Sequence, residues 1–219
     1  QRAPDRVTVV RITESDLQRF GHPVPDAVLA DALAHVLSAQ PRTVGVDLFR
    51  DLPAGPGRER LAALARTHAE IVFAESLPSP GRALVPAPEF VERARQRAFG
   101  DVLRDEDGRV RRLLLLASAE DGRPLDGLAL RLSETWLERE RGLHPRSWVH
   151  APHDDGPELR LGRGHLPRLR TGDPAYGSFD DRGYQVRNDF VHGRTAYRTT
   201  TLGRLLDGHA DEEIFRDRA

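Results

Sequence analysis

Hydrophobic positions along this chain follow two spacings in turn, which predicts alternating strands and helices. Residues 6–13 are rich in β-branched side chains and predict a first strand. Between residues 26 and 40 the apolar side chains recur at helical spacing, and residues 43–49 predict a second strand. A strand, a helix and a further strand in this order are typical of a βαβ unit with parallel strands.

The same alternation continues through the rest of the chain. Further helices are predicted at 58–68, 89–97, 126–141 and 200–206, and further strands at 70–75, 158–161, 165–170 and 184–191. No internal repeat or low-complexity tract divides the chain. We therefore expect one α/β domain over residues 1–219, with a mixed sheet, βαβ units and helices covering the sheet.

The most specific local pattern lies between residues 99 and 116. Two apolar runs flank Asp105-Glu106-Asp107-Gly108, and a glycine supplies the positive φ that a tight turn needs. The second run becomes continuous from Leu113 to Leu116, which is typical of a strand buried on both faces. This stretch predicts a β-hairpin at the centre of the core.

Composition limits the possible functions. The formal charge of −1, from 33 basic and 34 acidic residues, argues against a nucleic-acid partner. The absence of cysteine excludes disulfides, thiol nucleophiles and zinc sites with sulfur ligands. No apolar stretch is long enough to span a bilayer. Since the chain begins at Gln1 and contains no methionine, we expect it to be a piece of a longer protein.

Two acidic regions could bind a ligand. Asp47 lies at the predicted carboxyl end of the second strand, where parallel sheets bind ligands, and Asp51 would offer a second carboxylate. Asp47 could equally cap a turn or pair with an arginine. Asp105 and Asp107 could bind a hard cation, but they are also ordinary turn residues.

The arginines next to the turn help to decide whether Asp105 and Asp107 bind a cation or are turn residues. Arg111 and Arg112 directly follow the turn, and because side chains alternate along a strand, at most one of them can point into a given pocket. The spacing of a calcium loop fails, since Arg109 and Leu116 occupy ligand positions. Turn chemistry is therefore the favoured interpretation of the two aspartates.

Enzymatic motifs are absent from the sequence. It contains no nucleophile elbow, phosphate-binding loop, zinc-protease helix or dinucleotide fingerprint. His150, His153, Asp154 and Asp155 form the one cluster with metal-ligand chemistry, although a proline between the histidines favours an exposed turn. We expect no catalytic residue, no metal and no cofactor.

Four segments together resemble the second family of CHASE domains. They cover nearly the whole chain, and the third is the most specific match. The segments are Val7–Pro25, the stretch Val44-Gly45-Val46-Asp47-Leu48-Phe49, the turn region from Gly100-Asp101-Val102 to Arg112, and Tyr184–Gly208 with its Thr-Leu-x-x-Leu-Leu-x-Gly ending.

This resemblance implies an extracytoplasmic sensory input domain that is itself not catalytic. The parent would be a membrane-bound adenylate or guanylate cyclase or a kinase. The domain would be held on the periplasmic or extracellular side by flanking transmembrane helices, would form a homodimer through the parent, and would respond to an unknown small-molecule or protein signal. The resemblance also implies one more apolar strand after Ala219.

At residue level the resemblance makes Asp47, Asp105, Asp107 and Arg111 members of a ligand pocket or a structural network. Two other functions stay open. One is an extracytoplasmic interaction or dimerisation module that binds no ligand. The other is a metal-dependent hydrolase built on Asp47 and Asp51, which would need carboxylates converging around a cation in a cleft.

Overall fold

The structure is a computed structural model that describes residues 6–78, 81, 83–119, 122–141, 146–150, 156–173, 179–188, 197–209 and 215. Its helices are α1 (Glu14–Phe20), α2 (Asp26–Ser38), α3 (Arg58–Thr67), α4 (Leu128–Arg141), α5 (Leu202–Leu206) and the 3₁₀ turn η1 (Ala94–Gln96). Its strands are β1 (Thr8–Arg11), β2 (Val44–Val46), β3 (Ile71–Glu75), β4 (Arg97–Phe99), β5 (Arg112–Ser118), β6 (Pro124–Asp126), β7 (Arg146–His150), β8 (Pro157–Leu161), β9 (Gly164–Leu166), β10 (Tyr184–Arg187) and β11 (Arg198–Thr201). None of the helices in these ranges is both long enough and apolar enough to cross a membrane.

Short parallel and antiparallel sheets make up the strand content. β2, β3 and β4 pair in parallel, and β1 pairs in parallel with β11. Two antiparallel sheets have the orders β10-β5-β6 and β7-β8-β9. A parallel bridge between Phe99 and Gly127 links the end of β4 to the residue after β6. The predicted mixed α/β class is confirmed.

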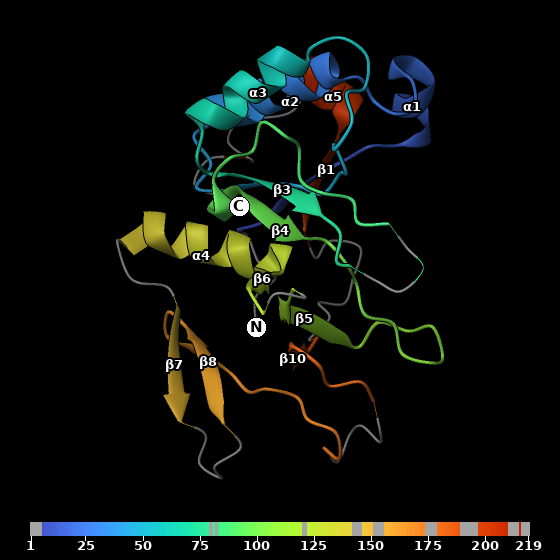
Figure 1. Cartoon of the computed structure of the whole chain (residues 1–219). Helices are drawn as coiled ribbons and strands as arrows, with labels where there is room; N and C mark the ends of the chain where they lie inside the picture. Colours follow the sequence, from blue (N-terminus) through green and yellow to red (C-terminus); the bar gives the residue numbers. More distant parts are fainter. Residues whose placement is uncertain are drawn as a thin grey trace.

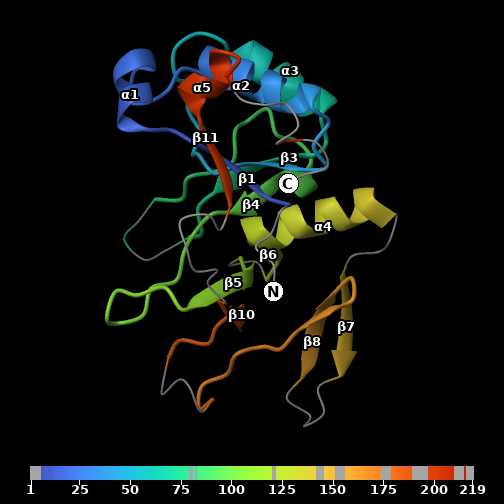
Figure 2. The same ribbon diagram turned by 180° about the vertical axis from the view of Figure 1, so that it is seen from behind.

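Helices cover both faces of the parallel strands. In Figures 1 and 2, α1, α2, α3 and α5 lie on one side of β1, β3 and β4, and α4 lies on the other side. Phe73, at the centre of β3, is fully buried and its ring contacts Phe90 edge to face, with 5.6 Å between centroids. This burial on both faces explains the continuous apolar sequence of β3.

For the hairpin predicted at 99–116, the turn is confirmed but the predicted strand pairing is wrong. Asp105 N–H donates to the Arg109 carbonyl at 2.8 Å, and Gly108 has a φ of 77°. Residues 100–104, directly before the turn, form no strand, and Val102 is 59% exposed. β5 instead forms a hairpin with β6 and pairs with the distant β10, because these partners bury its leucine run.

Long-range contacts overturn two other local predictions. The helix expected at 89–97 is only the single turn η1, because the buried Gln96 amide donates to the carbonyls of Ala65, His68 and Ile71. The segment expected to start a helix at Thr200 is first the strand β11, which pairs with β1 along all four of its residues. In the described part of the chain, β11 is therefore the strand that pairs with β1.

A joint between α1 and α5 ties the start of the described chain to its end. The Thr13 hydroxyl and Asp16 cap the first turn of α1, and the buried Asp16 carboxylate also accepts the Gly203 N–H at 2.8 Å. On the surface of the same joint, Arg19 forms two hydrogen bonds of 2.8 Å with Asp207. One aspartate therefore serves as a helix cap and a tertiary contact.

Asp16→Ala is expected to lower the free energy of unfolding by about 2 kcal/mol, because α1 loses its cap and a buried N–H loses its acceptor. Glu14→Ala changes an exposed carboxylate in the same turn and is the matched control, with an effect within about 0.5 kcal/mol. Denaturant unfolding measures both. Equal losses in the two variants would contradict the proposed role of Asp16.

The same residue predicts a dependence on pH. Burial raises the pKa of Asp16, but hydrogen bonds from Thr13 and Gly203 outweigh burial, so the pKa lies below its ordinary value. The stabilisation is therefore complete above the unfolded pKa of about 4 and is lost as pH falls through the lower folded value. The difference in unfolding free energy between wild type and Asp16→Asn should shrink below about pH 4.

Candidate functional site

Three of the four sequence-predicted site residues meet at the turn before β5. The Arg111 guanidinium donates to Asp105 at 2.9 Å and to both carboxylate oxygens of Asp107 at 2.9 and 2.7 Å. The backbone turn described above sets this arrangement, because it brings Asp105 and Asp107 to the same side as the arginine. These contacts are local, since they span at most six residues.

Arg112 connects the turn to the core. Its Nε donates to Asp105 at 2.8 Å, and its Nη1 donates to the Gln185 side chain on β10 at 2.8 Å and to the Asp180 carbonyl at 3.3 Å. Its guanidinium also lies over the Phe179 ring, 4.5 Å from the centroid. As expected from strand alternation, Arg111 stays outside while Arg112 is buried.

The charges at this turn compensate one another, and we call this group of ion pairs the clamp. Hydrogen bonds from Arg111 lower the pKa of Asp105 and, still more, that of Asp107, and the same contacts raise the pKa of Arg111. The Arg182 guanidinium lowers the pKa of Asp180 to about 2. Both carboxylates of the turn already accept from guanidinium groups, so the turn offers a cation few free oxygens. The bond from Arg112 to Gln185 holds β5 and β10 together.

Asp47 lies elsewhere, just after β2, and is exposed. Its carboxylate has no hydrogen-bond or ion-pair partner among the described residues, and a Cβ at Gly100 would lie 3.0 Å from its Oδ1. Asp51 lies in the following loop, where its carbonyl accepts from Arg58 at 3.2 Å. The part of the chain that the structure describes contains no group of three acidic or histidine side chains placed to hold a metal ion.

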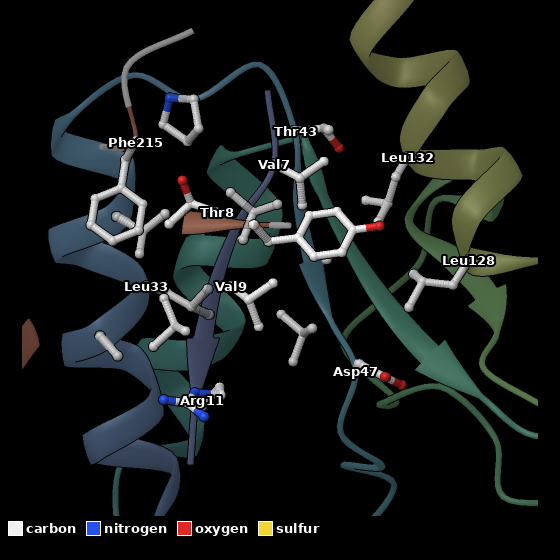
Figure 3. A pocket seen from close by; sticks show the side chains of 18 of the residues that line it. Val7, Thr8, Val9, Arg11, Leu33, Thr43, Asp47, Leu128, Leu132 and Phe215 are labelled. Atoms are coloured by element: carbon white, nitrogen blue, oxygen red, sulfur yellow. The ribbon is translucent and has the colours of Figure 1, made fainter. Parts of the chain in front are cut away.

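Asp47 marks one end of a large apolar groove. The groove has a volume of about 1060 Å³ and lies between β1 and β2, with α2 and α5 on one face and α4 on the other. Figure 3 shows Val7, Val9 and Arg11 along β1, and Thr43 and Asp47 at the two ends of β2. Leu33 of α2 and Leu132 of α4 line its opposite walls.

A comparison with models of protein families identifies the family of this chain. A model of the family described as the CHASE2 domain matches residues 1–219, the whole chain. The chain belongs to the CHASE2 domain family. CHASE2 domains are extracytoplasmic sensory domains of signalling proteins. No curated protein and no solved structure matches the chain.

Sequence reasoning missed two buried charge clusters in this CHASE2 domain. Asp26, fully buried at the start of α2, lies 4.0 Å from Arg50 and 3.5 Å from Arg58, and its carboxylate accepts the Ala54 N–H at 3.3 Å. This cluster fixes the loop that follows Asp47 against α2. Its members are far apart in the sequence, and an aspartate at a helix start was the only local signal.

The second missed cluster joins β6, α4 and β7. Arg146 forms an ion pair with Asp126 at 2.9 Å and a hydrogen bond with Glu134, and Arg131 bridges the same two carboxylates. Burial of Arg146 lowers its pKa, but the bonds to Glu134 and Asp126 more than compensate and raise the pKa. The sequence-predicted metal cluster falls mostly on His153, Asp154 and Asp155, which lie outside the described residues.

Arg112→Gln is expected to lower the free energy of unfolding by about 3 kcal/mol, because it leaves the Asp105 carboxylate and the Gln185 amide short of partners in the core. Arg111→Gln removes a half-exposed guanidinium from a surface ion pair and should lower the free energy of unfolding much less. Urea unfolding of the two variants measures the difference. A larger loss from Arg111→Gln would contradict the assignment of the clamp to Arg112.

Asp47→Asn is expected to change the free energy of unfolding by less than about 0.5 kcal/mol, because the carboxylate is exposed and has no partner among the described residues. Thermal unfolding measures the change. The matched control is Asp105→Asn, which breaks the turn contacts and should be clearly less stable. A strongly destabilised Asp47→Asn would show that this carboxylate holds the fold.

Proposed function

We propose that this CHASE2 domain is the input module of a membrane-bound cyclase or protein kinase and relays an external signal through transmembrane helices. Membership of an extracytoplasmic sensory family over the whole chain carries this proposal. The domain itself performs no bond chemistry in this scheme. Asp47, Asp105, Asp107 and Arg111 then serve as pocket or network residues.

The position of the two chain ends supports a relay. Arg6, at the start of the described chain, and Phe215, at its end, line the same groove. The α1–α5 joint also connects an early helix to a late one through Arg19 and Asp207. In the proposed relay, a shift of the joint would move both an early and a late part of the domain.

A signal acts on such a module through its different affinity for two arrangements of the domain or of its dimer. The proposed stimulus is a small molecule or a protein, and the proposed oligomer is a homodimer formed through the parent. Asp47 is suited to a ligand contact because its carboxylate is exposed at the mouth of the groove without a partner in the described chain. The clamp residues are suited to stiffening the sheet that transmits the change.

The test uses the full-length protein with a cysteine pair, Arg19→Cys with Asp207→Cys, placed across the α1–α5 joint. Residues 1–219 contain no cysteine, so the pair is the only thiol pair in the domain. Cross-linking the two thiols with a short cleavable bismaleimide should change the cyclase or kinase output by about fivefold or more, and cleavage of the linker should restore it. The single variant Arg19→Cys is the control and should not respond.

Location is tested with the same single variant. The thiol at position 19 should react with a membrane-impermeant maleimide added outside cells or spheroplasts. Labelling only after the cytoplasm is opened would overturn the extracytoplasmic assignment for this protein. An output that ignores the locked joint would overturn the relay and favour an interaction module without signalling motion.

A further inference from the structure

The loops at the carboxyl ends of β2, β3 and β4 expose a group of large apolar side chains. Because the three strands are parallel, these loops leave the sheet at one edge, and Figures 1 and 2 show the chain leaving β3 and β4 there. The loops carry four of the seven large apolar side chains that are exposed in the described ranges, namely Phe49, Leu52, Leu84 and Val102. Leu52 is 72% exposed. Apolar side chains gathered on the loops of a folded domain are typical of an interaction surface.

Hydrogen bonds hold the loops after β3 and β4 beside each other. The Ser76 N–H donates to the Val85 carbonyl at 2.8 Å, which places Leu84 next to the end of β3. The Leu77 N–H donates to the Asp101 carboxylate at 2.6 Å, and Asp101 directly follows the end of β4. The apolar side chains of these two loops therefore lie on one preformed surface.

The loop after β2 is joined to the same surface by Arg58. This guanidinium donates to the Asp51 carbonyl at 3.2 Å and to Glu89 Oε1 at 3.0 Å. Since Asp51 lies in the loop after β2 and Glu89 in the segment after β3, one side chain ties the two segments together. Phe49 and Leu52, on either side of Asp51, are thereby held at the same edge of the sheet.

Two charged side chains of opposite sign lie on the outer loops of this edge. The Asp51 carboxylate after β2 and the exposed Arg104 guanidinium after β4 have no hydrogen bond or ion pair in the part of the chain that the structure describes. The sheet order β2-β3-β4 places them on opposite flanks, with the loop after β3 between them. We call the four apolar side chains together with Asp51 and Arg104 the edge surface.

We propose that the edge surface binds the same surface of a second copy of this chain. A two-fold axis through the loop after β3 would place the loop after β2 of one copy against the loop after β4 of the other. Asp51 would then pair with the partner's Arg104 at two symmetric positions, and Leu84 would lie near the axis. A partner of a single charge would match only one flank of the edge surface, whereas a second copy matches both.

This proposal rests on the proposed homodimer and assigns the surface through which two domains meet. Leu84→Cys, as the only cysteine of the full-length protein, places a thiol near the two-fold axis. A short bismaleimide added to membranes should then link two copies. The matched control is Trp148→Cys on β7, because Trp148 is 48% exposed and Leu84 is 53% exposed. The control should give at least about fivefold less linked dimer, since it lies outside the edge surface.

Exchange of the two charges tests how the flanks pair. In the Leu84→Cys protein, Asp51→Arg alone or Arg104→Asp alone would bring like charges together at both symmetric contacts, so linking should slow by about fivefold. The combined variant restores opposite charges and should recover at least half of the original rate. A combined variant that links as slowly as the single variants would overturn the two-fold pairing.

The size of the full-length protein separates this proposal from the homodimer on which it rests. A protein that is dimeric by light scattering but gives no link through Leu84→Cys would overturn the role of the edge surface and leave the homodimer standing. A monomeric protein would overturn both. Linking of Leu84→Cys to a different protein, with no link between two copies, would assign the edge surface to that partner and also contradict the proposal.

Discussion

Parallel strands held between two layers of helices impose the main constraint on this CHASE2 domain. Such strands bury both faces and must satisfy their backbone groups through neighbouring strands. β3 meets both conditions, with partners on each side and full burial of Ile71, Val72 and Phe73. β1 and β2 lie between the same helical layers but are less buried, with Val9 37% exposed, and among the described residues each pairs on one side only. The groove between them follows from this difference.

Charged side chains in the core act mainly as connections between elements that are distant in sequence. Arg112 joins the turn at Asp105 to β10, Asp26 holds the loop after β2, and Asp16 joins α1 to α5. Each is a buried group whose partners lie in another element, so loss of one partner leaves the other unsatisfied. These connections couple elements that are far apart in the sequence through polar contacts.

The candidate site is divided between two places. The acidic turn is locally closed by arginines, whereas Asp47 faces the groove without a partner in the described chain. A ligand contact is therefore better placed at Asp47 than at Asp105 or Asp107. The family membership supplies the sensory role, and the geometry supplies the residues at which that role can be tested.

Local sequence determined those features whose contacts are also local. The apolar periodicity of residues 26–38 and the turn at Gly108 depend on neighbours within a few positions, and both were predictable. Tertiary structure alone decided that β5 pairs with β10 and β6, that Gln96 ends a helical pattern by binding three distant carbonyls, and that residues 198–201 form a strand beside β1. In each case the deciding hydrogen bonds join residues far apart in the chain. A local sequence pattern cannot predict which distant segment the fold will place beside it.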